Sequence, residues 1–558
     1  MRRPAIASLL LGIVLALSLI VVACSAQTAP APSAPANAPG ASAPTSAPAQ
    51  SGQAAAKAEK VLTIGVAGDI ETIDPPFGAA TRANETIKNI YDQPLRYARK
   101  STGEGYEIAD VTKVEGSAWE SFTIDPDGVT VRVKVRPGTK FTKSGNEVTA
   151  DDVAYKFERS FGVKAGTQWI ANTVGIFDMN QIKVDGKNDV TIKLKDPTPL
   201  FGPLMRDQDF GMEDSKAVKS KASADDPWAT KWMAKNDAGS GEYFMESWTP
   251  GVEMVLRANK DYWAGPAYFD KVVIKIVPSA ADRVLLLRQG AIDIAEDLTL
   301  DEIEGLRGSP GVKILSIPSR NQILFGLNNS LPPFNNVKVR QALSYAVPYD
   351  QIVKDVFKGQ ALAGKGAWPQ RAQFHDSSTF PYTYDPEKAK ALLAEAGAQN
   401  LKFQLAIRQG QMDMEQLAVV LQNAFRQVGV DMEIQKVAPA VFQEKLAKRE
   451  HVAWMQPSLS YVDDPFYHLF LWYKTDTVIN WFKYSNKRVD EITEALRTEL
   501  DPKKRETLAK EAQKIINSEA PALYPGELNY VLAMRDNIDG FVLEPDHLVW
   551  YYPLRRKE

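Results

Sequence analysis

The sequence predicts an α/β protein with mixed sheets and more than one domain. Three observations support this prediction: strand and helix patterns alternate from Val61 onward, hydrophobic residues make up 44% of the chain against 24% charged residues, and the chain is 558 residues long. Such a composition is typical of soluble globular proteins. Because a single hydrophobic core rarely serves more than about 250–300 residues, this length requires several domains.

The predicted strands show either a continuous apolar run or strict alternation. Residues 61–67 (VLTIGVA) form an apolar run, as expected for a buried strand. In 128–138 (GVTVRVKVRPG), valines alternate with Thr, Arg and Lys until a Pro-Gly pair ends the pattern, which is typical of a half-buried strand. Residues 189–196 (DVTIKLKD) and 430–435 (VDMEIQ) alternate in the same way.

The predicted helices begin at capping residues. Thr149 precedes ADDVAYKF, so we expect its side chain to cap a helix whose first turn carries two aspartates, where the helix dipole favours negative charge. The Asp-Pro pairs at 385–386 and 501–502 place Pro at the first helical position. Apolar residues at helical spacing over 414–428, followed by Gly429, predict a further helix and its end.

The N-terminus resembles an export signal followed by a lipid-attachment site. Arg2 and Arg3 precede an uncharged apolar run over 5–23, which is the order of a signal peptide. The residues VVAC, which end at Cys24, resemble the lipobox of bacterial lipoproteins, in which the cysteine thiol takes the lipid and becomes the new N-terminus. We therefore expect a signal peptide at 1–23 and lipidation of Cys24. Since the run approaches the ~20 residues of a spanning helix, a retained membrane helix is the alternative.

Residues 24–57 are predicted to be a disordered tether. Positions 25–56 carry no charged residue and consist mostly of Ala, Pro, Ser and Gln. Such a segment has too little to bury to offset the entropy of ordering, and its prolines keep it extended. Its expected role is to hold a folded body away from a membrane surface.

Charge, cysteine and histidine usage exclude several classes of protein. The formal net charge of −3 provides no basic patch for nucleic acid. Cys24 is the only cysteine, so no disulfide is expected. The four histidines lie far apart without helical pairing, so neither a metal site nor a cofactor is expected; they are His375, His451, His468 and His547.

The motifs that suggest catalysis are weak. Residues 359–366 (GQALAGKG) match the start of a phosphate-binding loop, but a Gly instead of Ser or Thr follows Lys365, so we interpret the segment as a flexible loop. Asp463 and Asp464 are adjacent carboxylates, yet Asp-Asp-Pro is more typical of a turn or a helix start. The sequence therefore does not predict an enzyme.

Five stretches follow one another along residues 61–558. They are LTIGVAGDIETIDPPF with NIYDQPLRY, VRVKVRPGTKFTKSGNEVTADDVAYKFER, GSGEYFMESWTPGVEMVLRANKDYWAGPAYFDKVVIKIVPSAADRVLLLRQGAIDIAED, LFGLNNSLPPFNNVKVRQALSYAVPYDQIV, and YDPEKAKALLAEAG with LQNAFRQVGVDMEIQ. In this order they resemble the family 5 extracytoplasmic solute-binding proteins, which are the oligopeptide, dipeptide and nickel receptors of ABC importers.

The resemblance implies a two-lobed periplasmic-binding-protein type II fold of the large class, with an inserted domain and a hinge. Domain I of lobe one would comprise 58–97, 204–320 and 520–558, and domain II would be the insertion 98–203. Lobe two, domain III, would comprise 321–519. The implied protein is a monomer without cofactor that passes its ligand to the transmembrane subunits of an ABC permease.

The resemblance also suggests where a ligand would bind. Peptide receptors of this family carry W-x-x-D-Y-x-x-P, whose Asp pairs with the α-amino group of the peptide. Aligning SLSYVDDPFYHLF on Pro465 places Tyr461 at that Asp and Ser458 at that Trp. A tyrosine cannot neutralise an ammonium group. Asp463, two residues later, would take the role in a shifted register.

Further candidate residues follow from their positions. Thr81 and Arg82 lie in the segment 79–85 (AATRANE), which matches a family segment that enters the cleft from lobe one. A solvated surface arginine is the alternative for Arg82. Arg408 ends a predicted strand where some relatives bind a ligand carboxylate. The aromatic candidates for the cleft walls, each with a core position as the alternative, are Trp169, Phe325 and Trp368.

These inferences predict a lipid-anchored receptor on the outer face of the cytoplasmic membrane. It would deliver a small organic solute to an ABC importer, and the family resemblance favours a peptide as that solute. An oligosaccharide or opine-like compound is the alternative, because an aromatic cleft without the Asp anchor suits such ligands; chelated nickel is a further one. From another class, an exported hydrolase would require a nucleophile and base within hydrogen-bonding distance. A receptor that signals to a sensor kinase is a further alternative function.

Overall fold

The computed structural model describes residues 58–78, 81–477 and 479–557. The predicted signal peptide (1–23), Cys24 and the predicted tether (24–57) lie outside the described residues. Within the described ranges, no helix is both long enough and apolar enough to cross a membrane.

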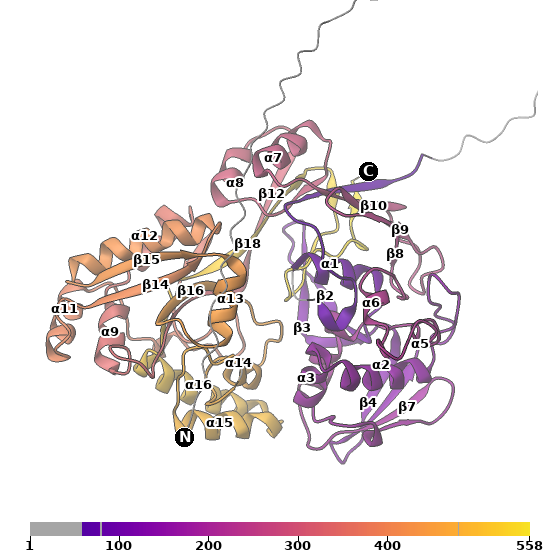
Figure 1. The fold of residues 1–558 in the computed structure, drawn as a ribbon, viewed down its shortest axis with the longest axis horizontal. Helices are drawn as coiled ribbons and strands as arrows, with labels where there is room; N and C mark the ends of the chain where they lie inside the picture. Colours follow the sequence, from indigo (N-terminus) through magenta and orange to yellow (C-terminus); the bar gives the residue numbers. More distant parts are fainter. Residues whose placement is uncertain (1–57, 79–80, 478, 558) are drawn as a thin grey trace, which may run out of the picture. The chain divides into compact units, whose positions relative to one another are not determined.

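A mixed sheet of twelve strands organises the structure (Figure 1). Ten strands form its main path, in the order β15 (Asp431–Val437), β14 (Lys402–Arg408), β16 (Ala453–Ser458), β12 (Val312–Leu327), β18 (Gly526–Arg535), β11 (Ile294–Ala295), β1 (Val61–Val66), β10 (Lys271–Ile276), β9 (Glu253–Ala258) and β8 (Tyr243–Thr249). The remaining two are β13 (Ala361–Ala363) on β18 and β17 (Ala522–Leu523) on β12. Strand β14 is parallel to β15 and β16, and β1 is parallel to β10 and β11, whereas the other pairs are antiparallel. The predicted mixed α/β class is confirmed.

Strands β12 and β18 connect the two halves of this sheet. Through 312–322, β12 pairs with β18, and through 322–327 it pairs with β16. Figure 1 shows both strands running between two groups of elements. We call the group that contains β1 and β8–β11 lobe one, and the group that contains β14–β16 lobe two.

Lobe two consists of its part of the sheet and the helices that cover it. These are α9 (Val337–Tyr345), α10 (Tyr349–Gln351) with a π-helical turn (Ile352–Val356), a 3-10 turn (Ser377–Thr379), α11 (Pro386–Glu395), α12 (Met412–Gln427), α13 (Pro439–Ala447), α14 (Pro465–Trp472), α15 (Lys487–Thr498) and α16 (Pro502–Glu519).

Lobe one adds three smaller sheets to its part of the large sheet. Their strand orders are β4 (Trp119–Ile124), β5 (Thr130–Val135), β7 (Asp189–Lys193), β6 (Ile182–Val184); β2 (Leu95–Ser101), β3 (Glu107–Gly116), β20 (Val542–Leu543); and β19 (Ile538–Asp539), β21 (Arg555–Arg556). Its helices are α1 (Thr81–Ile90), α2 (Ala150–Val163), α3 (Gly166–Thr173), α4 (Phe201–Met205), α5 (Ser215–Lys219), α6 (Thr230–Met233), α7 (Ala280–Gln289) and α8 (Leu300–Leu306), with 3-10 turns at Pro75–Phe77, Met179–Gln181 and Gln208–Phe210.

A bulge interrupts β12 between the lobes. The pairing with β18 changes from Ile317 opposite Tyr530 to Asn321 opposite Leu528, so three residues of β12 face one residue of β18. The Ser319 hydroxyl donates to the Leu528 carbonyl at 2.7 Å. Such bulges bend a strand and redirect its side chains. This bulge presents residues 318–320 at the junction of the lobes.

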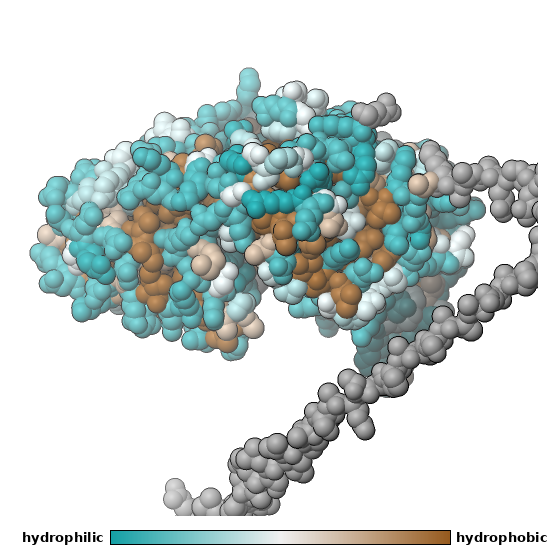
Figure 2. Space-filling view, turned by 90° about the horizontal axis from the view of Figure 1, so that it is seen from above, coloured by the Kyte–Doolittle hydropathy of each residue, from teal (hydrophilic) through white to brown (hydrophobic). Residues whose placement is uncertain are grey.

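The apolar core continues from one lobe into the other. One cluster fills lobe one around β1 and α1, and a second fills lobe two around α9 and α12. A third extends from β5 and α2 in lobe one to α14 and α16 in lobe two. Because of this third cluster, the lobes meet through apolar contacts as well as through β12 and β18. The face in Figure 2 is largely hydrophilic, with hydrophobic residues grouped between polar ones.

Most of the elements expected from the sequence are confirmed. Strands β1, β5, β7 and β15 lie where alternation or apolar runs predicted them. The Asp152 carboxylate accepts hydrogen bonds from the Thr149 backbone N–H and hydroxyl at 2.8 and 2.9 Å, which caps α2. Asp385 and Asp501 cap α11 and α16. The prediction of a loop over 359–366 is wrong in part, because β13 lies within this segment and pairs with β18. A strand of three residues is too short to show an alternating pattern in the sequence.

Gly326 is predicted to be essential for packing between β12 and β16. A Cβ atom at this position would lie 2.1 Å from the indole of Trp454, which is buried and stacked on Phe482. We expect Gly326→Ala to lower the free energy of unfolding by about 1–3 kcal/mol, since overpacking displaces the indole. Gly305 lies in α8 with no atom near its absent Cβ, so Gly305→Ala should stabilise by up to about 1 kcal/mol. Urea denaturation of both variants measures their free energies of unfolding. Equal changes in the two variants would contradict the predicted packing role of Gly326.

Candidate functional site

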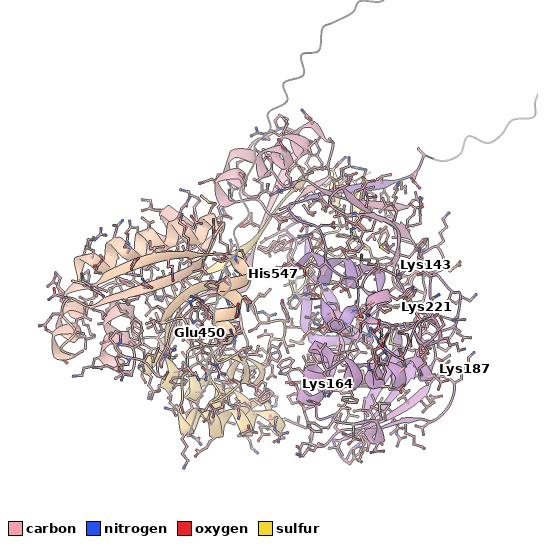
Figure 3. The ribbon with its side chains drawn as sticks, in the orientation of Figure 1. Lys143, Lys164, Lys187, Lys221, Glu450 and His547 are labelled. Atoms are coloured by element: carbon pink, nitrogen blue, oxygen red, sulfur yellow. The ribbon has the colours of Figure 1, made fainter. Side chains whose placement is uncertain are left out.

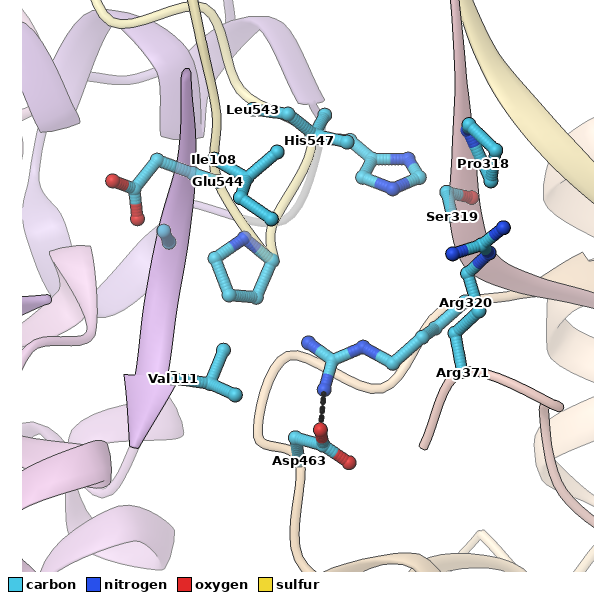
Figure 4. A pocket seen from close by; sticks show the side chains of 12 residues that line it. Ile108, Val111, Pro318, Ser319, Arg320, Arg371, Asp463, Leu543, Glu544 and His547 are labelled. Carbon is cyan, nitrogen blue, oxygen red and sulfur yellow. Dashed lines mark ion pairs between the residues drawn. The ribbon is translucent and has the colours of Figure 1, made fainter. Parts of the chain in front are cut away.

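A cavity of about 230 Å³ lies between the two lobes. Lobe one contributes the face of β3 and the segment after β20, while the bulge of β12 and two lobe-two loops form the opposite wall (Figure 4). The lining residues are Ile108, Ala109, Val111, Pro318, Ser319, Arg320, Arg371, Asp463, Leu543, Glu544, Pro545 and His547. A cavity with walls from both lobes can hold a small molecule only while the lobes are together.

An ion pair between Arg320 and Asp463 crosses the lobe-two wall of this cavity. Arg320 Nη1 lies 2.8 Å from Asp463 Oδ2, and the two side chains are 10% and 7% exposed. Asp463 Oδ1 also accepts a hydrogen bond from the Gln373 backbone N–H at 2.9 Å. Both carboxylate oxygens therefore have partners in the protein. Removing one partner of such a buried pair typically costs about 3–5 kcal/mol, because the other charge is left uncompensated.

Asp546 fixes the segment that forms the lobe-one wall. Its carboxylate accepts two hydrogen bonds from Lys88 Nζ at 3.0 and 2.9 Å and one from the Leu548 backbone N–H at 3.0 Å. Arg206 Nη1 lies 3.4 Å away. Burial acts to raise the pKa of Asp546, but the charges of Lys88 and Arg206 outweigh it and hold this pKa below its usual value. The anchored carboxylate keeps residues 543–547 against β3.

His547 occupies the cavity wall as a neutral side chain. Figure 3 shows it at the junction of the lobes, and its ring packs edge-on against Tyr530 with centroids 5.2 Å apart. Burial lowers the pKa of His547 to about 4; the charge of Asp546 opposes this shift and that of Arg320 adds to it. At neutral pH, His547 therefore adds no charge to the cavity.

A second, much smaller cavity of about 10 Å³ adjoins the first one and shares Arg320 and Asp463 with it. Trp368 and His468 line it, with their rings 5.2 Å apart. His468 Nδ1 lies 3.2 Å from the Ser460 hydroxyl, and its Nε2 lies 2.9 Å from the Ala367 carbonyl oxygen. Burial lowers the pKa of His468 to about 4. This space holds a water molecule at most.

Of the residues predicted from the sequence, Asp463 lines the main cavity and Trp368 the small one. Tyr461 is 37% exposed, and its backbone carbonyl accepts a hydrogen bond from Arg206 at 3.0 Å across the lobes. Its enclosure by the surrounding protein raises its pKa to about 12. Tyr461 is therefore a neutral phenol near the junction of the lobes.

Trp169 contacts the opposite lobe. Its ring, in α3 of lobe one, lies 6.1 Å from the ring of Tyr467 and 6.3 Å from that of Phe470, both in α14 of lobe two. Nearby, Arg497 Nη1 lies 2.9 Å from Asp196 Oδ2. These contacts join the two lobes, so Trp169 contributes to the interface between them.

Four further predicted residues, like Tyr461 and Trp169, lie outside both cavities. Arg82 is buried in α1 and paired with Glu85 and Glu296, whereas Thr81 at the start of α1 is exposed. Phe325 is fully buried in the core of lobe two. Arg408 ends β14, where its Nη2 donates to Gln456 Oε1 at 3.2 Å.

Sequence reasoning missed the two arginines of the main cavity. Arg320 follows Pro318 and Ser319, which separate two apolar stretches of the same strand. This interruption is the signal in the sequence that could have indicated a bulge. Arg371 lies in a loop without periodicity. Within the described ranges, no group of three or more His, Cys, Asp or Glu side chains could hold a metal ion.

Comparison with known proteins supports the family resemblance. A family model for bacterial extracellular solute-binding proteins, family 5 Middle, matches residues 113–480. Among curated proteins, the chain is similar to the probable D,D-dipeptide-binding periplasmic protein DdpA of Escherichia coli K12. The two are 27% identical over 493 residues, which is 87% of this chain and 92% of DdpA.

Solved structures show the same fold. The periplasmic binding protein DppA from Helicobacter pylori, in complex with the peptide STSA, has a TM-score of 0.78 and 23% identity over 90% of this chain and 99% of that chain. MoaA from A. tumefaciens R10, in complex with mannopinic acid, has a TM-score of 0.76 and 25% identity over 90% of this chain and 100% of that chain. These likenesses confirm the predicted two-lobed type II binding-protein fold.

The low pKa of His468 predicts a specific loss of stability in acid. The folded state favours the neutral ring, so the contribution is complete above the unfolded-state pKa of about 6.5 and declines as pH falls toward 4. Relative to His468→Gln, the parent should lose about 2–3 kcal/mol of unfolding free energy between pH 7.5 and 4.5. Urea denaturation at both pH values measures this difference. The control Tyr461→Phe retains His468 and should lose stability over this range as the parent does, whereas an equal profile for His468→Gln and the parent would contradict the prediction.

Proposed function

Because the chain belongs to the bacterial extracellular solute-binding proteins of family 5, we propose that it is the receptor of an ABC importer, which encloses a peptide between its lobes and delivers it to a membrane permease. The observation that carries this proposal is the cavity walled by both lobes. DdpA and DppA, named above for dipeptide and peptide ligands, support peptide as the ligand class.

Binding in such a receptor works by a shift between open and closed states. A ligand that contacts β3 on one side and Arg320 on the other makes its full set of contacts only when the lobes are closed, so it stabilises closure. The contacts of Trp169 with α14 and of Arg497 with Asp196 form in the same arrangement. A permease can then read closure as a change of surface, without any bond being made or broken.

The rival hydrolase has one feature in its favour, which is the 3.2 Å contact between Ser460 and His468. Three properties argue against catalysis there. The two side chains are buried, the adjoining space of about 10 Å³ cannot admit a substrate carbonyl, and a histidine with a pKa of about 4 is a weak base at neutral pH. We therefore propose a structural role for this pair, in keeping with a family of binding proteins.

An opine-like solute is the second candidate ligand. MoaA, at 25% identity, was solved with mannopinic acid. In this chain, Tyr461 replaces the aspartate that pairs with a peptide α-amino group in the resembling receptors. Both facts favour a ligand whose recognition does not depend on that anchor.

The remaining features of the receptor belong to the same proposal. We propose that the protein is exported, that lipid on Cys24 holds it at the outer face of the cytoplasmic membrane, and that it works as a monomer. Lobe one would comprise 58–97, 204–320 and 520–558 with domain II at 98–203 inserted, and lobe two 321–519. The pairing of β12 with β18 next to Arg320 supports a hinge near residue 320.

A cavity-filling substitution tests whether ligand binds between the lobes. Val111, on β3, faces the cavity (Figure 4), and Val111→Trp should fill much of its volume of about 230 Å³. Purified protein would be incubated with a random tripeptide mixture, and retained peptides identified by mass spectrometry after ultrafiltration. The parent should retain peptides and Val111→Trp at least tenfold less.

Val252 is 56% exposed and lies outside the cavity, so Val252→Trp is the matched control and should bind as the parent does. Thermal unfolding should be similar for both variants. Retention of no peptide by the parent would refute the peptide assignment, and full binding by folded Val111→Trp would place the ligand elsewhere.

A further inference from the structure

We infer that the cavity between the lobes selects an anionic solute, with the carboxylate of the solute against the guanidinium groups of Arg320 and Arg371, and that it does not require a free ammonium group on the ligand. This inference rests on the proposed receptor function and defines the chemistry of its ligand. It follows from the charges that line the cavity and from the partners that those charges already have.

Arg320 brings a largely buried positive charge to the cavity. Its side chain is 10% exposed, and among the described residues its Nη1 atom makes no hydrogen bond of normal geometry, although Asp463 is within ion-pair distance. The bulge of β12 directs this side chain between the lobes. A guanidinium group has five N–H donors, and one carboxylate oxygen cannot satisfy them. Arg320 therefore retains donors for an incoming anion.

Asp463 is not free to serve as a cation anchor. Its Oδ2 is paired with Arg320 at 2.8 Å, and its Oδ1 accepts from the Gln373 N–H at 2.9 Å. Arg320 already neutralises the charge of Asp463, so a ligand ammonium would gain little from the remaining lone pairs of this carboxylate. Displacing Arg320 would instead leave a buried guanidinium without its counter-charge, which is unfavourable in a low-dielectric site. Arg320 thus serves as the counter-ion of Asp463 in place of a ligand cation.

Arg371 supplies the second guanidinium. It is exposed, lines the same cavity, and forms no ion pair with any described residue. Figure 4 shows its guanidinium group beside Ser319, on the same side of the cavity as Arg320. Two guanidinium groups that face one space match a carboxylate, which accepts such donors at both oxygens.

The other titratable groups nearby do not cancel this charge. His547 is neutral at pH 7, as argued above. The Glu544 carboxylate points away from Arg320 in Figure 4, toward the region of Lys88 and Arg206. Glu527, near Arg371, is buried and hydrogen-bonded to Gln370. On the lobe-two wall, two arginines accompany one carboxylate, so this wall of the cavity is positive.

The opposite wall is largely apolar. Ile108, Val111 and Leu543 face the two arginines across the cavity (Figure 4). Pro545 also lines the cavity. A solute that fits both walls carries a carboxylate at one end and an apolar group at the other. N-blocked peptides, and peptides whose amino group lies elsewhere, meet this description without an ammonium anchor.

The test compares one random tripeptide mixture in three forms: unmodified, N-acetylated, and C-amidated. Retention on the purified protein is measured by ultrafiltration and mass spectrometry. We expect the acetylated form to be retained within threefold of the unmodified form, and the amidated form at least tenfold less. Retention of the amidated form with loss of the acetylated form would overturn the inference, because it would show that the site selects the ammonium group.

A pair of variants ties the result to the arginines. Arg371→Gln removes an exposed charge from the cavity and should weaken retention of the acetylated form at least tenfold. Arg426 is exposed on α12, and among the described residues its side chain is hydrogen-bonded only to Asn423. The matched control Arg426→Gln should therefore bind as the parent does. Equal binding by Arg371→Gln and the parent would also overturn the inference.

A non-peptide pair separates this inference from the proposed ligand class. Hexanoate and hexylamine have the same alkyl chain and opposite charges. Hexanoate at millimolar concentration should raise the melting temperature of the parent but not that of Arg371→Gln, and hexylamine should raise neither. If no peptide form is retained but hexanoate behaves in this way, the peptide assignment fails while the anionic selection stands. If neither hexanoate nor an acetylated peptide binds, the inference is refuted.

Discussion

The pairing of β12 with β18 is the constraint on which the rest of the structure depends. These two strands carry the backbone hydrogen bonds that continue the large sheet from lobe one into lobe two. A connection of only two strands can twist far more readily than the packed sheets on either side of it. The bulge at 318–320 lies within this connection, where it interrupts the ladder and bends the strand. The interrupted part of the ladder therefore also carries Arg320 into the cavity.

The two walls of the cavity differ in chemistry because they are built differently. Lobe one presents a strand face and a segment fixed by Asp546, and its surface is largely apolar. Lobe two presents charged side chains on loops and on the bulge. A ligand can meet the charged wall first and exclude water from the apolar wall on closure, which strengthens the electrostatic contacts already made. The order of events thus follows from where the charges lie.

Local features could be predicted from the sequence, whereas the residues that line the cavity depend on contacts between distant parts of the chain. Alternating valines at 129–135 and the capping aspartates of α11 and α16 act over a few residues, so their signals are complete in the sequence. Arg82 was expected in the cleft, but whether an arginine faces a cavity or a buried carboxylate depends on Glu296, more than two hundred residues away. The same limit applies to Phe325, whose neighbours Phe403 and Phe425 come from other elements. Asp463 was identified by its offset from Tyr461, and only the fold reveals that Arg320 is its partner.

That partnership bears on the prediction that Tyr461 takes the position of the family aspartate. Replacing a carboxylate by a phenol in an otherwise unchanged site would simply weaken the binding of an ammonium group. Here Asp463, two residues further along the chain, is held by a cation from the protein itself. Specificity is a difference between affinities, and an internal ion pair lowers the affinity for cationic ligands without any steric obstruction. The same pair lowers the cost of burying Arg320 in the absence of ligand, so the empty site remains stable. A single contact of 2.8 Å thereby couples the stability of the empty receptor to the charge of the solute that it admits.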